Sequence, residues 1–507
     1  MTDQEAISKE TTEITAAGEE ASGGLSLTVE KNVYAPDEII RVTVTGADPQ
    51  DWVGIYAERA EPGSVDAITW QYVNGASPVL FTASSLQGAG EYGVFLCDND
   101  GYLVLDKKTI RILSDDRTDY GVRSAVYASS KENGVAKASV TIQPSSEKEL
   151  HYSLYWSADG RRLEDYEPLA QVVHSGEEPF EIRLNNCLFM PEEADGVEVA
   201  VKEGLSTSHF AGADDTLKVP ASSLRYRFQV ISDMHIISGE DRPQHVSHLK
   251  AALLDIQKLS PDSIGIFTVG DNTDRGKEEN YICLQETVDS VTDENSPPMY
   301  YALGNHDLVY GGGSYKEQVA LFKKYTGMPA AYYSVDLAGT KFIVLGSESL
   351  VGEGTIGKKQ LDWLRQELAT AGKNQPVFLF LHQPLIDTVS GSLYSLDPET
   401  QTWYGIDTGD SIREILKEYP NAVLFTGHTH WTLESRQPIL FGGGTDASFV
   451  NTAAVGYLWD DNNDSAPGSE GYFIEVYDDY ILLRGREFVD GKWCAAAQFL
   501  FPLPTQA

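Results

Sequence analysis

Short apolar segments recur through the second half of the chain, and each is followed by a cluster of polar residues. The segments cover residues 228–231, 264–269, 299–303, 377–381 and 423–426. Continuous apolar runs of this length are typical of buried parallel strands. Open α/β sheets carry their functional groups in loops at the carboxyl ends of such strands. The pattern therefore predicts a sheet whose site lies along that edge.

Between these segments, apolar residues spaced by three or four positions predict amphipathic helices. The clearest stripe runs from Val246 to Leu259 and ends at Ser260-Pro261. Similar stripes predict helices over residues 357–372 and 410–419. A helix after the first strand makes a βαβ crossover, which brings successive loops to one edge of the sheet. Residues 332–336 and 341–345 predict a hairpin, so we expect a mixed sheet, with strands over 471–477, 481–486 and 499–502 closing a second layer.

The first half of the chain has short alternating strands and turn residues but no helical stripe. This pattern over residues 25–113 predicts a β-sandwich. A second all-β unit is predicted after it, with strands at 137–142, 150–156, 180–184 and 197–202. Its segment 152–156, followed by Asp159-Gly160 and residues 163–166, resembles an Ig-like or fibronectin-like module.

These patterns predict four segments. Residues 1–24 form an acidic leader with too little apolar surface to fold, residues 25–116 and 117–222 form two β-sandwiches, and residues 223–507 form an α/β domain. The leader lacks the basic and apolar regions of a signal peptide, which predicts a cytoplasmic protein, or an extracytoplasmic one if the chain has been trimmed.

Charge and composition exclude several classes of partner. The formal net charge is −38, so we expect no long-range attraction to nucleic acids or anionic bilayers. No apolar run reaches the roughly 18 residues that a membrane-spanning helix needs. The four cysteines form no CxxC pair, which argues against a cysteine zinc site.

The polar clusters combine carboxylates, one carboxamide and several imidazoles. They are Asp233-Met-His235, Gly270-Asp271-Asn-Thr-Asp274-Arg275, Gly304-Asn305-His306-Asp307, His382 and Gly427-His428-Thr-His430. This ligand mixture suits two divalent cations, with zinc or iron favoured by imidazole and manganese kept open by the oxygen ligands. In an extended segment, alternate residues such as Asp233 and His235 would face the same side and chelate one ion.

The order and spacing of these five clusters resemble the calcineurin-like metallophosphoesterase superfamily. The resemblance covers the chain from about Tyr226 onwards. It implies a mixed two-sheet α/β fold flanked by helices and a dinuclear metal centre. Asp233, His235 and His430 would hold the first metal, Asp271 would bridge, and Asn305, His382 and His428 would hold the second.

The same resemblance implies roles for residues that are not ligands. His306 would act as general acid or transition-state donor, with Asp307 orienting its ring. Arg275 would bind a phosphate oxygen or form a salt bridge to a neighbouring carboxylate. Purple acid phosphatases carry a tyrosine ligand where this chain has Asp274, so we expect a colourless protein.

The implied function is metal-assisted hydrolysis of a phosphate ester by a hydroxide held between the metals. We favour a phosphodiesterase, because the motifs add no cationic cluster that would suit a more highly charged ester. The alternatives are a phosphomonoesterase or nucleotidase, or a binding scaffold with a vestigial domain. The substrate would be a small molecule or the head group of a lipid or polymer. Candidate rim loops are residues 307–315, 386–403 with Tyr394 and Trp403, and 442–460.

Two sets of residues have competing interpretations. His245 and His248 lie three apart on the first predicted helix, and we favour a solvated helix face over the mouth of a cleft. The stretch 51–56, with Trp70, Tyr72 and Tyr92, resembles the Ig-like module called SKICH. We interpret its aromatic residues as sandwich core. The alternative is that they bind a ligand, a partner, a surface or carbohydrate.

Overall fold

The computed structural model describes residues 25–503 except for short gaps at 35–37, 58–59, 61, 64, 75–77, 87, 89, 100, 113–120, 133–134, 203–206, 240–241, 372–374, 400 and 402–404. The chain divides into two compact units, Met1–Asp119 and Tyr120–Ala507. The predicted leader, the predicted boundary at 116–117 and Trp403 lie outside the described residues. Among the described residues, no helix has both the length and the apolar character needed to cross a membrane.

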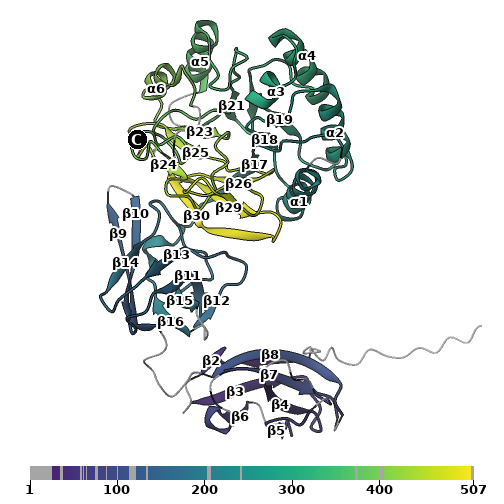
Figure 1. The fold of residues 1–507 in the computed structure, drawn as a ribbon, viewed down its shortest axis with the longest axis vertical. Helices are drawn as coiled ribbons and strands as arrows, with labels where there is room; N and C mark the ends of the chain where they lie inside the picture. Colours follow the sequence, from purple (N-terminus) through teal and green to yellow (C-terminus); the bar gives the residue numbers. More distant parts are fainter. Residues whose placement is uncertain are drawn as a thin grey trace, which may run out of the picture. The chain divides into compact units, whose positions relative to one another are not determined.

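The first unit contains two β-sheets that enclose an apolar core (Figure 1). One sheet has the order β1-β3-β6 and the other β2-β8-β7-β4-β5. Their bounds are β1 Ser26–Val29, β2 Val33–Tyr34, β3 Ile39–Thr45, β4 Trp52–Ala57, β5 Thr69–Tyr72, β6 Val79–Thr82, β7 Gly90–Cys97 and β8 Val104–Ile112. Strand β3 alternates exposed and buried residues, as a strand with one face on a core must. The predicted β-sandwich is therefore observed.

The aromatic residues of this unit differ in part from the prediction. Tyr92 lies in the core between the sheets, together with Val53 and Ile55. Trp52 and Tyr56, which alternate with those two residues along β4, form a separate cluster on the other face. Trp70 is 51% exposed. The interpretation of these aromatics as sandwich core holds for Tyr92 and is wrong for the exposed Trp70 and Tyr72. Trp52 and Tyr56 are buried, but on the outer face of β4, because alternation alone does not say which face of a strand meets the core between the sheets.

The second unit begins with another all-β sandwich. Its two sheets have the orders β14-β10-β9 and β12-β11-β15-β16, with β13 also paired to β11. The strands are β9 Val122–Glu132, β10 Val135–Pro144, β11 Leu150–Ala158, β12 Arg161–Arg162, β13 Ala170–His174, β14 Phe180–Arg183, β15 Gly196–Lys202 and β16 Thr207–Gly212. Trp156 and Tyr152 are buried in its core.

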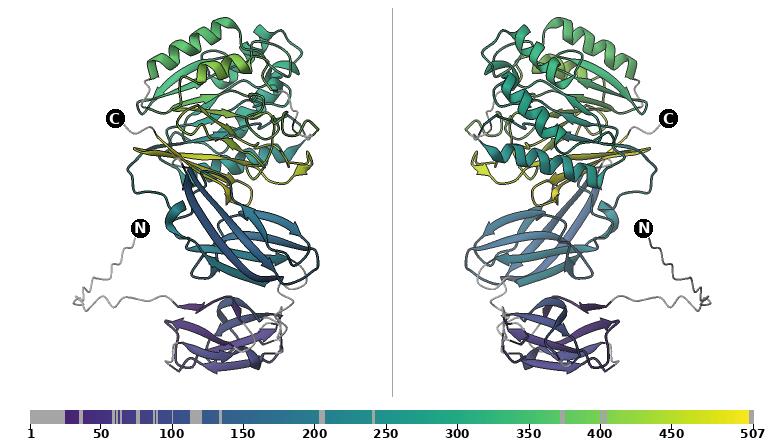
Figure 2. Two further views of the ribbon diagram at one scale, coloured as in Figure 1. Left: turned by 90° about the vertical axis from the view of Figure 1, so that its left-hand side faces the viewer. Right: turned by 90° about the vertical axis from the view of Figure 1, so that its right-hand side faces the viewer.

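This sandwich is joined to the remainder of the unit through the last strand, β30 (Lys492–Pro502). Leu188 forms a β-bridge with Phe499, and Tyr166 forms one with Trp493. Ala495 of β30 belongs to the core of the sandwich itself. Figure 2 shows β9 and β10 extending towards these C-terminal strands in both views. The shared strand makes the sandwich part of the α/β body.

Two six-stranded sheets form the centre of the α/β region, in the orders β19-β18-β17-β28-β29-β30 and β20-β21-β22-β23-β25-β24. Their bounds are β17 Leu224–Ile231, β18 Ile266–Thr268, β19 Met299–Tyr301, β20 Tyr333–Leu337, β21 Thr340–Val344, β22 Val377–Phe380, β23 Ala422–Thr426, β24 Ile439–Leu440, β25 Ser448–Asn451, β28 Glu470–Tyr477 and β29 Tyr480–Glu487. A pair formed by β26 Leu458–Trp459 and β27 Ser465–Ala466 lies apart. The sheets pack face to face over a layer of phenylalanines, where Phe267 stacks on Phe342 and Phe380 at 4.8 and 4.5 Å between ring centroids. The predicted mixed two-sheet fold is confirmed.

Helices cover the outer faces of both sheets (Figure 1). The first sheet is covered by α1 Pro243–Leu259, α2 Glu278–Asp289 and α4 Tyr315–Thr326, and the second by α5 Lys358–Ala371 and α6 Gly409–Leu416. A short helix, α3 (Asn305–Val309), begins directly after β19. The periodicity correctly predicted α1, α5 and α6.

Candidate metal centre

The predicted ligands follow the carboxyl ends of parallel strands in both sheets. Asp233 follows β17, Asp271 follows β18, Asn305 follows β19, His382 follows β22, and His428 follows β23. Strands β17, β18 and β19 pair in parallel, as do β22 and β23. Because parallel strands end at one edge, all five loops meet there. The structure thus brings the predicted ligand residues together at this edge.

The loops achieve this convergence in a backbone conformation that the sequence pattern did not predict. Asp233, His235, Asp271, His428 and His430 all have positive φ, between 46° and 70°. The expected extended conformation of Asp233-Met-His235 is therefore wrong, and the ligand residues of His428-Thr-His430 are not extended either. Non-glycine residues seldom adopt this left-handed region, and such strain concentrates at functional sites.

Backbone hydrogen bonds between the loops hold this conformation. The amide of Asp233 donates to the Gly270 carbonyl at 3.1 Å, and the amide of His235 donates to the Asp271 carbonyl at 2.9 Å. Each loop thereby fixes its neighbour. The strained conformations persist because several loops determine them together.

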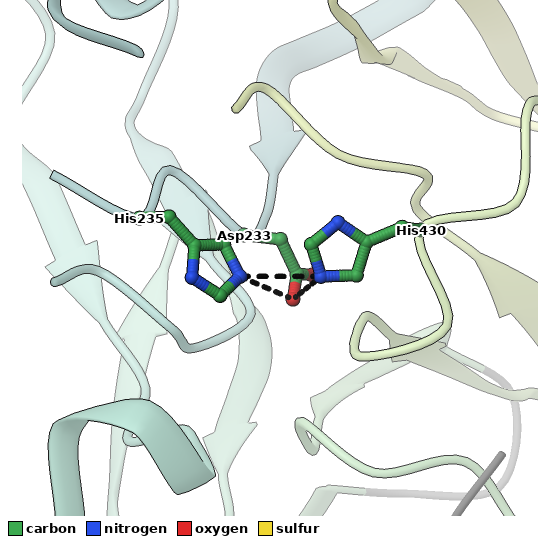
Figure 3. A group of neighbouring side chains, drawn as sticks. All are labelled: Asp233, His235 and His430. Carbon is green, nitrogen blue, oxygen red and sulfur yellow. Dashed lines mark hydrogen bonds and ion pairs between the residues drawn. The ribbon is translucent and has the colours of Figure 1, made fainter. Parts of the chain in front are cut away.

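The first ligand group consists of Asp233, His235 and His430 (Figure 3). The Nε2 atoms of His235 and His430 lie 3.2 Å apart. Asp233 Oδ1 lies 3.1 Å from His430 Nε2 and 3.7 Å from His235 Nε2. All three side chains are buried. Three ligand atoms thus converge on one point.

The second group consists of Asp271, His382 and His428, with Asn305 beside it. Asp271 Oδ2 lies 3.2 Å from His382 Nε2 and 3.6 Å from His235 Nε2 of the first group. Asn305 Oδ1 lies 2.9 Å from His382 Nε2. Asp271 therefore stands between the two groups. We call these seven residues, Asp233, His235, Asp271, Asn305, His382, His428 and His430, the metal cage.

Two glycines make room for this packing. A Cβ atom on Gly304 would lie 2.0 Å from Asp271 Oδ1, and one on Gly427 would lie 2.4 Å from Asp233 Oδ2. No side chain fits at such separations, so only glycine lets the loops come this close.

The tautomers of the histidines indicate that the cage fits cations. His382 Nδ1 donates to the Val269 carbonyl at 2.8 Å, and His430 Nδ1 donates to the Tyr457 carbonyl at 2.9 Å. A neutral ring bonded in this way presents a lone pair at Nε2. Both Nε2 atoms face carboxylate oxygens, which are also acceptors. Acceptors can converge on one another only around positive charge, which either a proton on the ring or a divalent cation can supply.

The pKa values show the same demand for positive charge. Burial lowers the pKa of His382, but the nearby Asp271 and Asp233 carboxylates outweigh it and raise that pKa to about 9. For His428, burial dominates and lowers the pKa to about 3, so this ring stays neutral and able to ligate. A cation at His382 would replace the proton that the carboxylates otherwise hold there.

His306 lies beside the cage and lines its opening. Its amide donates to Asp271 Oδ1 at 2.7 Å, and its ring Nδ1 donates to the Asp274 carbonyl at 2.7 Å. The ring is therefore fixed through one nitrogen. The other nitrogen, Nε2, is left out of that bond.

Asp307 does not orient the His306 ring, which corrects the predicted role. Its buried carboxylate accepts hydrogen bonds from the amides of Asn272, Thr273 and Gly304 and from the side chains of Asn272 and Thr273. The ring is oriented instead by the backbone of Asp274. Through these hydrogen bonds, Asp307 links the ligand loop after β18 to the ligand loop after β19.

Asp274 and Arg275 occupy the opening of the site. Asp274 Oδ1 lies 3.4 Å from His235 Nδ1, on the side of the ring away from the cage. Arg275 Nε lies 3.4 Å from Asp274 Oδ2, and the arginine side chain is about half exposed. Arg275 therefore forms the predicted salt bridge while its outer atoms remain accessible.

A pocket of about 400 Å³ lies at this opening. Its described lining residues are Arg242, Asp274, Arg275, Lys277, His306, Tyr310 and Tyr457. Arg242 Nη1 also pairs with Asp274 Oδ1, at 3.2 Å. Three cationic side chains therefore border the pocket. We expected no cationic cluster at the site and preferred diesters for that reason. This expectation is wrong.

Two further residues, His245 and Tyr457, lie against the metal cage. His245 of α1 is buried, its Nδ1 donates to the His235 carbonyl at 2.8 Å, and its ring stacks on Tyr457. Tyr457 also stacks on His430, with centroids 4.2 Å apart. The expected solvated helix face is wrong for His245, because α1 packs this turn against the metal loops. Tyr310 and Tyr457 come from two of the three predicted rim loops.

Comparison with known proteins identifies the region that contains the site. Residues 226–432 match the family model described as calcineurin-like phosphoesterase. The predicted resemblance to that superfamily is confirmed for this region, and the preceding β-rich region is consistent with Ig-like modules.

The chain is also similar to several named proteins. A probable cyclic nucleotide phosphodiesterase of Rhodococcus erythropolis is 29% identical over 209 residues, which are 40% of this chain and 64% of that protein. A cAMP/cGMP dual specificity phosphodiesterase of Mycobacterium tuberculosis is 28% identical over 215 residues, 40% of this chain and 61% of that protein. A solved purple acid phosphatase from yellow lupin seeds is 12% identical with a TM-score of 0.40, over 95% of this chain and 99% of that chain. The chain thus spans under two thirds of the two bacterial relatives.

Proposed function

We propose that the calcineurin-like phosphoesterase domain of this chain hydrolyses phosphate esters with two bound divalent cations, and that its preferred substrates are phosphodiesters. The observation that carries the proposal is the position of Asp271 between two buried groups of acid and histidine ligands. A single bridging carboxylate places two cations next to each other, as a two-metal phosphoesterase requires.

The grouping of the side chains supports the following ligand sets. Asp233, His235 and His430 would hold the first cation, Asn305, His382 and His428 the second, and Asp271 both. Imidazole and carboxylate ligands together suit manganese, zinc or iron. When bound, the cations supply an activated water and neutralise charge on the phosphoryl oxygens.

The protein's own side chains position the substrate and move its proton. His306 donates its Nδ1 proton to the Asp274 carbonyl, so the ring acts as an acid only when it is doubly protonated, by passing its Nε2 proton to the leaving oxygen. Arg242, Arg275 and Lys277 border the pocket and attract an anionic ester despite the net charge of −38. Asp274 anchors His235 from behind, which fixes the ligand atom of that ring.

Diesters are favoured because the two relatives described above are named as phosphodiesterases of cyclic nucleotides. Tyr310 and Tyr457 border the same pocket and offer aromatic faces to a base or sugar. The second candidate is a phosphomonoesterase. It is favoured by the three cations at the rim, since a monoester carries the greater negative charge.

A comparison of two chromogenic esters tests the proposal. We expect metal-free protein to be inactive on bis(p-nitrophenyl) phosphate and to gain activity with manganese, zinc or iron, with slower turnover of p-nitrophenyl phosphate. Equal rates on both esters, or faster turnover of the monoester, would reject the preference for diesters. No turnover of either ester or of cyclic nucleotides by metal-loaded protein would leave the binding scaffold as the better explanation.

A further inference from the structure

The first unit contains an aromatic pocket that has no part in the proposed hydrolysis. It has a volume of about 270 Å³ and is lined by Trp52, Tyr56, Asp66, Trp70, Tyr72 and Tyr102, with Ala67 beside them. We call this the aromatic pocket. Its volume lies just below the roughly 300–1,000 Å³ of sites for drug-sized ligands, so it suits a small head group.

Strands β4 and β5 build the pocket on the outer face of their sheet. Trp52 is paired with Tyr72, and Gly54 is paired with Trp70. Since side chains alternate along a strand, Trp52 and Tyr56 project together with Trp70 and Tyr72, while Val53 and Ile55 enter the core. The aromatic residues are therefore not needed to fill the space between the sheets.

A glycine lets these rings lie over the strand. A Cβ atom on Gly54 would come within 2.6 Å of Trp52 Cζ3 and 3.0 Å of Tyr56 Cε2. Any other residue at this position would push both rings away from the sheet. The local sequence Trp-Val-Gly-Ile-Tyr thus shapes the floor of the pocket.

The rings stand at steep angles to one another. Trp52 meets Trp70 at 75° and Tyr102 at 86°, with centroids 6.0 Å apart in both pairs. Trp70 meets Tyr72 at 89°, with centroids 5.1 Å apart. Perpendicular rings form the walls of a cage, whereas a sugar ring stacks on one flat face. Trp70 and Tyr102 remain 51% and 59% exposed, so their faces are open to a ligand.

Charge selects the class of ligand. Among the described residues that line the pocket, Asp66 carries the only charge, and it is negative. Aromatic faces attract cations through their quadrupoles, most strongly for tryptophan. The same sheet face already binds one cation in this way, since Lys107 Nζ lies 4.7 Å from the centroid of Phe95, a residue of the same outer cluster.

We propose that the aromatic pocket binds an alkylated ammonium group, the chemistry shared by free choline-like cations and the head group of phosphatidylcholine. The rings surround the methyl groups, and Asp66 neutralises the charge. This pocket shares no residue with the metal cage, so the binding proposal can be tested separately from the proposed hydrolysis.

The test uses the full chain and saturation-transfer NMR on the methyl protons of choline. We expect saturable binding of choline and tetramethylammonium, and much weaker binding of 3,3-dimethylbutan-1-ol, the uncharged analogue of choline. Trp70→Ala and Asp66→Asn should each weaken choline binding about tenfold. Leu80→Ala, an exposed residue of β6 in the other sheet, is the matched control and should bind as the unaltered chain does.

Vesicles distinguish the two sources of the ligand. Sedimentation with phosphatidylcholine vesicles that choline reverses identifies the lipid, and choline binding without sedimentation identifies a soluble cation. Three results would overturn the proposal: no saturable response to either cation, equal binding of the uncharged analogue, or binding of neutral oligosaccharides instead. Unchanged circular dichroism of Trp70→Ala would exclude misfolding as the cause of lost binding.

Discussion

The metal cage and the aromatic pocket are built in opposite ways. The cage side chains are buried, their loops adopt left-handed backbone conformations, and hydrogen bonds between loops fix each one. The aromatic pocket lies on regular paired strands, and two of its tryptophan and tyrosine rings are more than half exposed. A site that must hold like-charged ligands together needs strain and burial, whereas a site for a soft cation needs only a face of the sheet.

The largest effect is expected at the ligand that joins the two halves of the cage. Asp271→Asn removes the bridging negative charge, so we expect loss of bound metal and a fall in kcat of roughly 10³-fold. Elemental analysis and turnover of a chromogenic diester measure both. Asp262→Asn, at an exposed ion pair with Arg227, is the control and should change neither. Full metal content and full activity in Asp271→Asn would contradict a bridging role for Asp271.

A smaller effect is expected where a side chain acts on the substrate without holding metal. His306→Ala should keep the metal content and lower kcat by about 10²-fold, since a proton donor is lost. His151→Ala, at an exposed position in the second sandwich, is the matched control. A loss of metal in His306→Ala would instead identify this residue as a metal ligand. Its ring lies close enough to His235 and Asp271 for that role.

A still smaller effect is expected at Asp274, which contacts a cage residue but is not itself part of the cage. Asp274→Asn weakens the contact with His235 Nδ1, and we expect the first cation to bind about 10- to 100-fold more weakly. At saturating metal, most of the activity should return. Activity that stays low at every metal concentration would show that Asp274 acts on the substrate instead.

The cationic side chains that border the pocket should affect substrate binding more than turnover. Arg275→Ala removes a half-exposed charge from the pocket, so we expect KM to rise about tenfold with little change in kcat. The effect should shrink as salt screens the attraction. An unchanged KM at low salt would leave Arg275 as a salt bridge to Asp274 alone.

The smallest effect is expected in the aromatic pocket. Trp70→Ala should change the free energy of unfolding by no more than about 0.5 kcal/mol, because the ring is half exposed and outside the core. It should leave diester hydrolysis unchanged. Chemical denaturation and the chromogenic assay measure both, and a large destabilisation would mean that the ring is structural.

The difference between the metal cage and the aromatic pocket also bears on how much the sequence could predict. The convergence of the cage side chains was predictable because few residue types bind metal, and their clusters follow apolar strands. Asp307 was misassigned because its neighbour in sequence, His306, is not its partner in space. Helices α2 and α4 were not predicted, since buried Asn280, Thr287 and Gln318 interrupt their apolar stripes.

The faces of the strands and the packing of α1 depend on tertiary structure. Alternation along β4 showed two faces but not which one meets the core, so Trp52 was misplaced. His245 and His248 look alike in sequence, and only the contact of α1 with the metal loops places His245 against His235. The left-handed ligand loops likewise result from hydrogen bonds between distant segments.

Anomalous X-ray scattering from crystals of the metal-reconstituted chain tests the central claim most directly. We expect two peaks inside the cage, one among Asp233, His235 and His430, the other among Asn305, His382 and His428, with Asp271 in contact with both. A single peak, or none, in protein loaded with manganese, zinc or iron would contradict the two-cation centre.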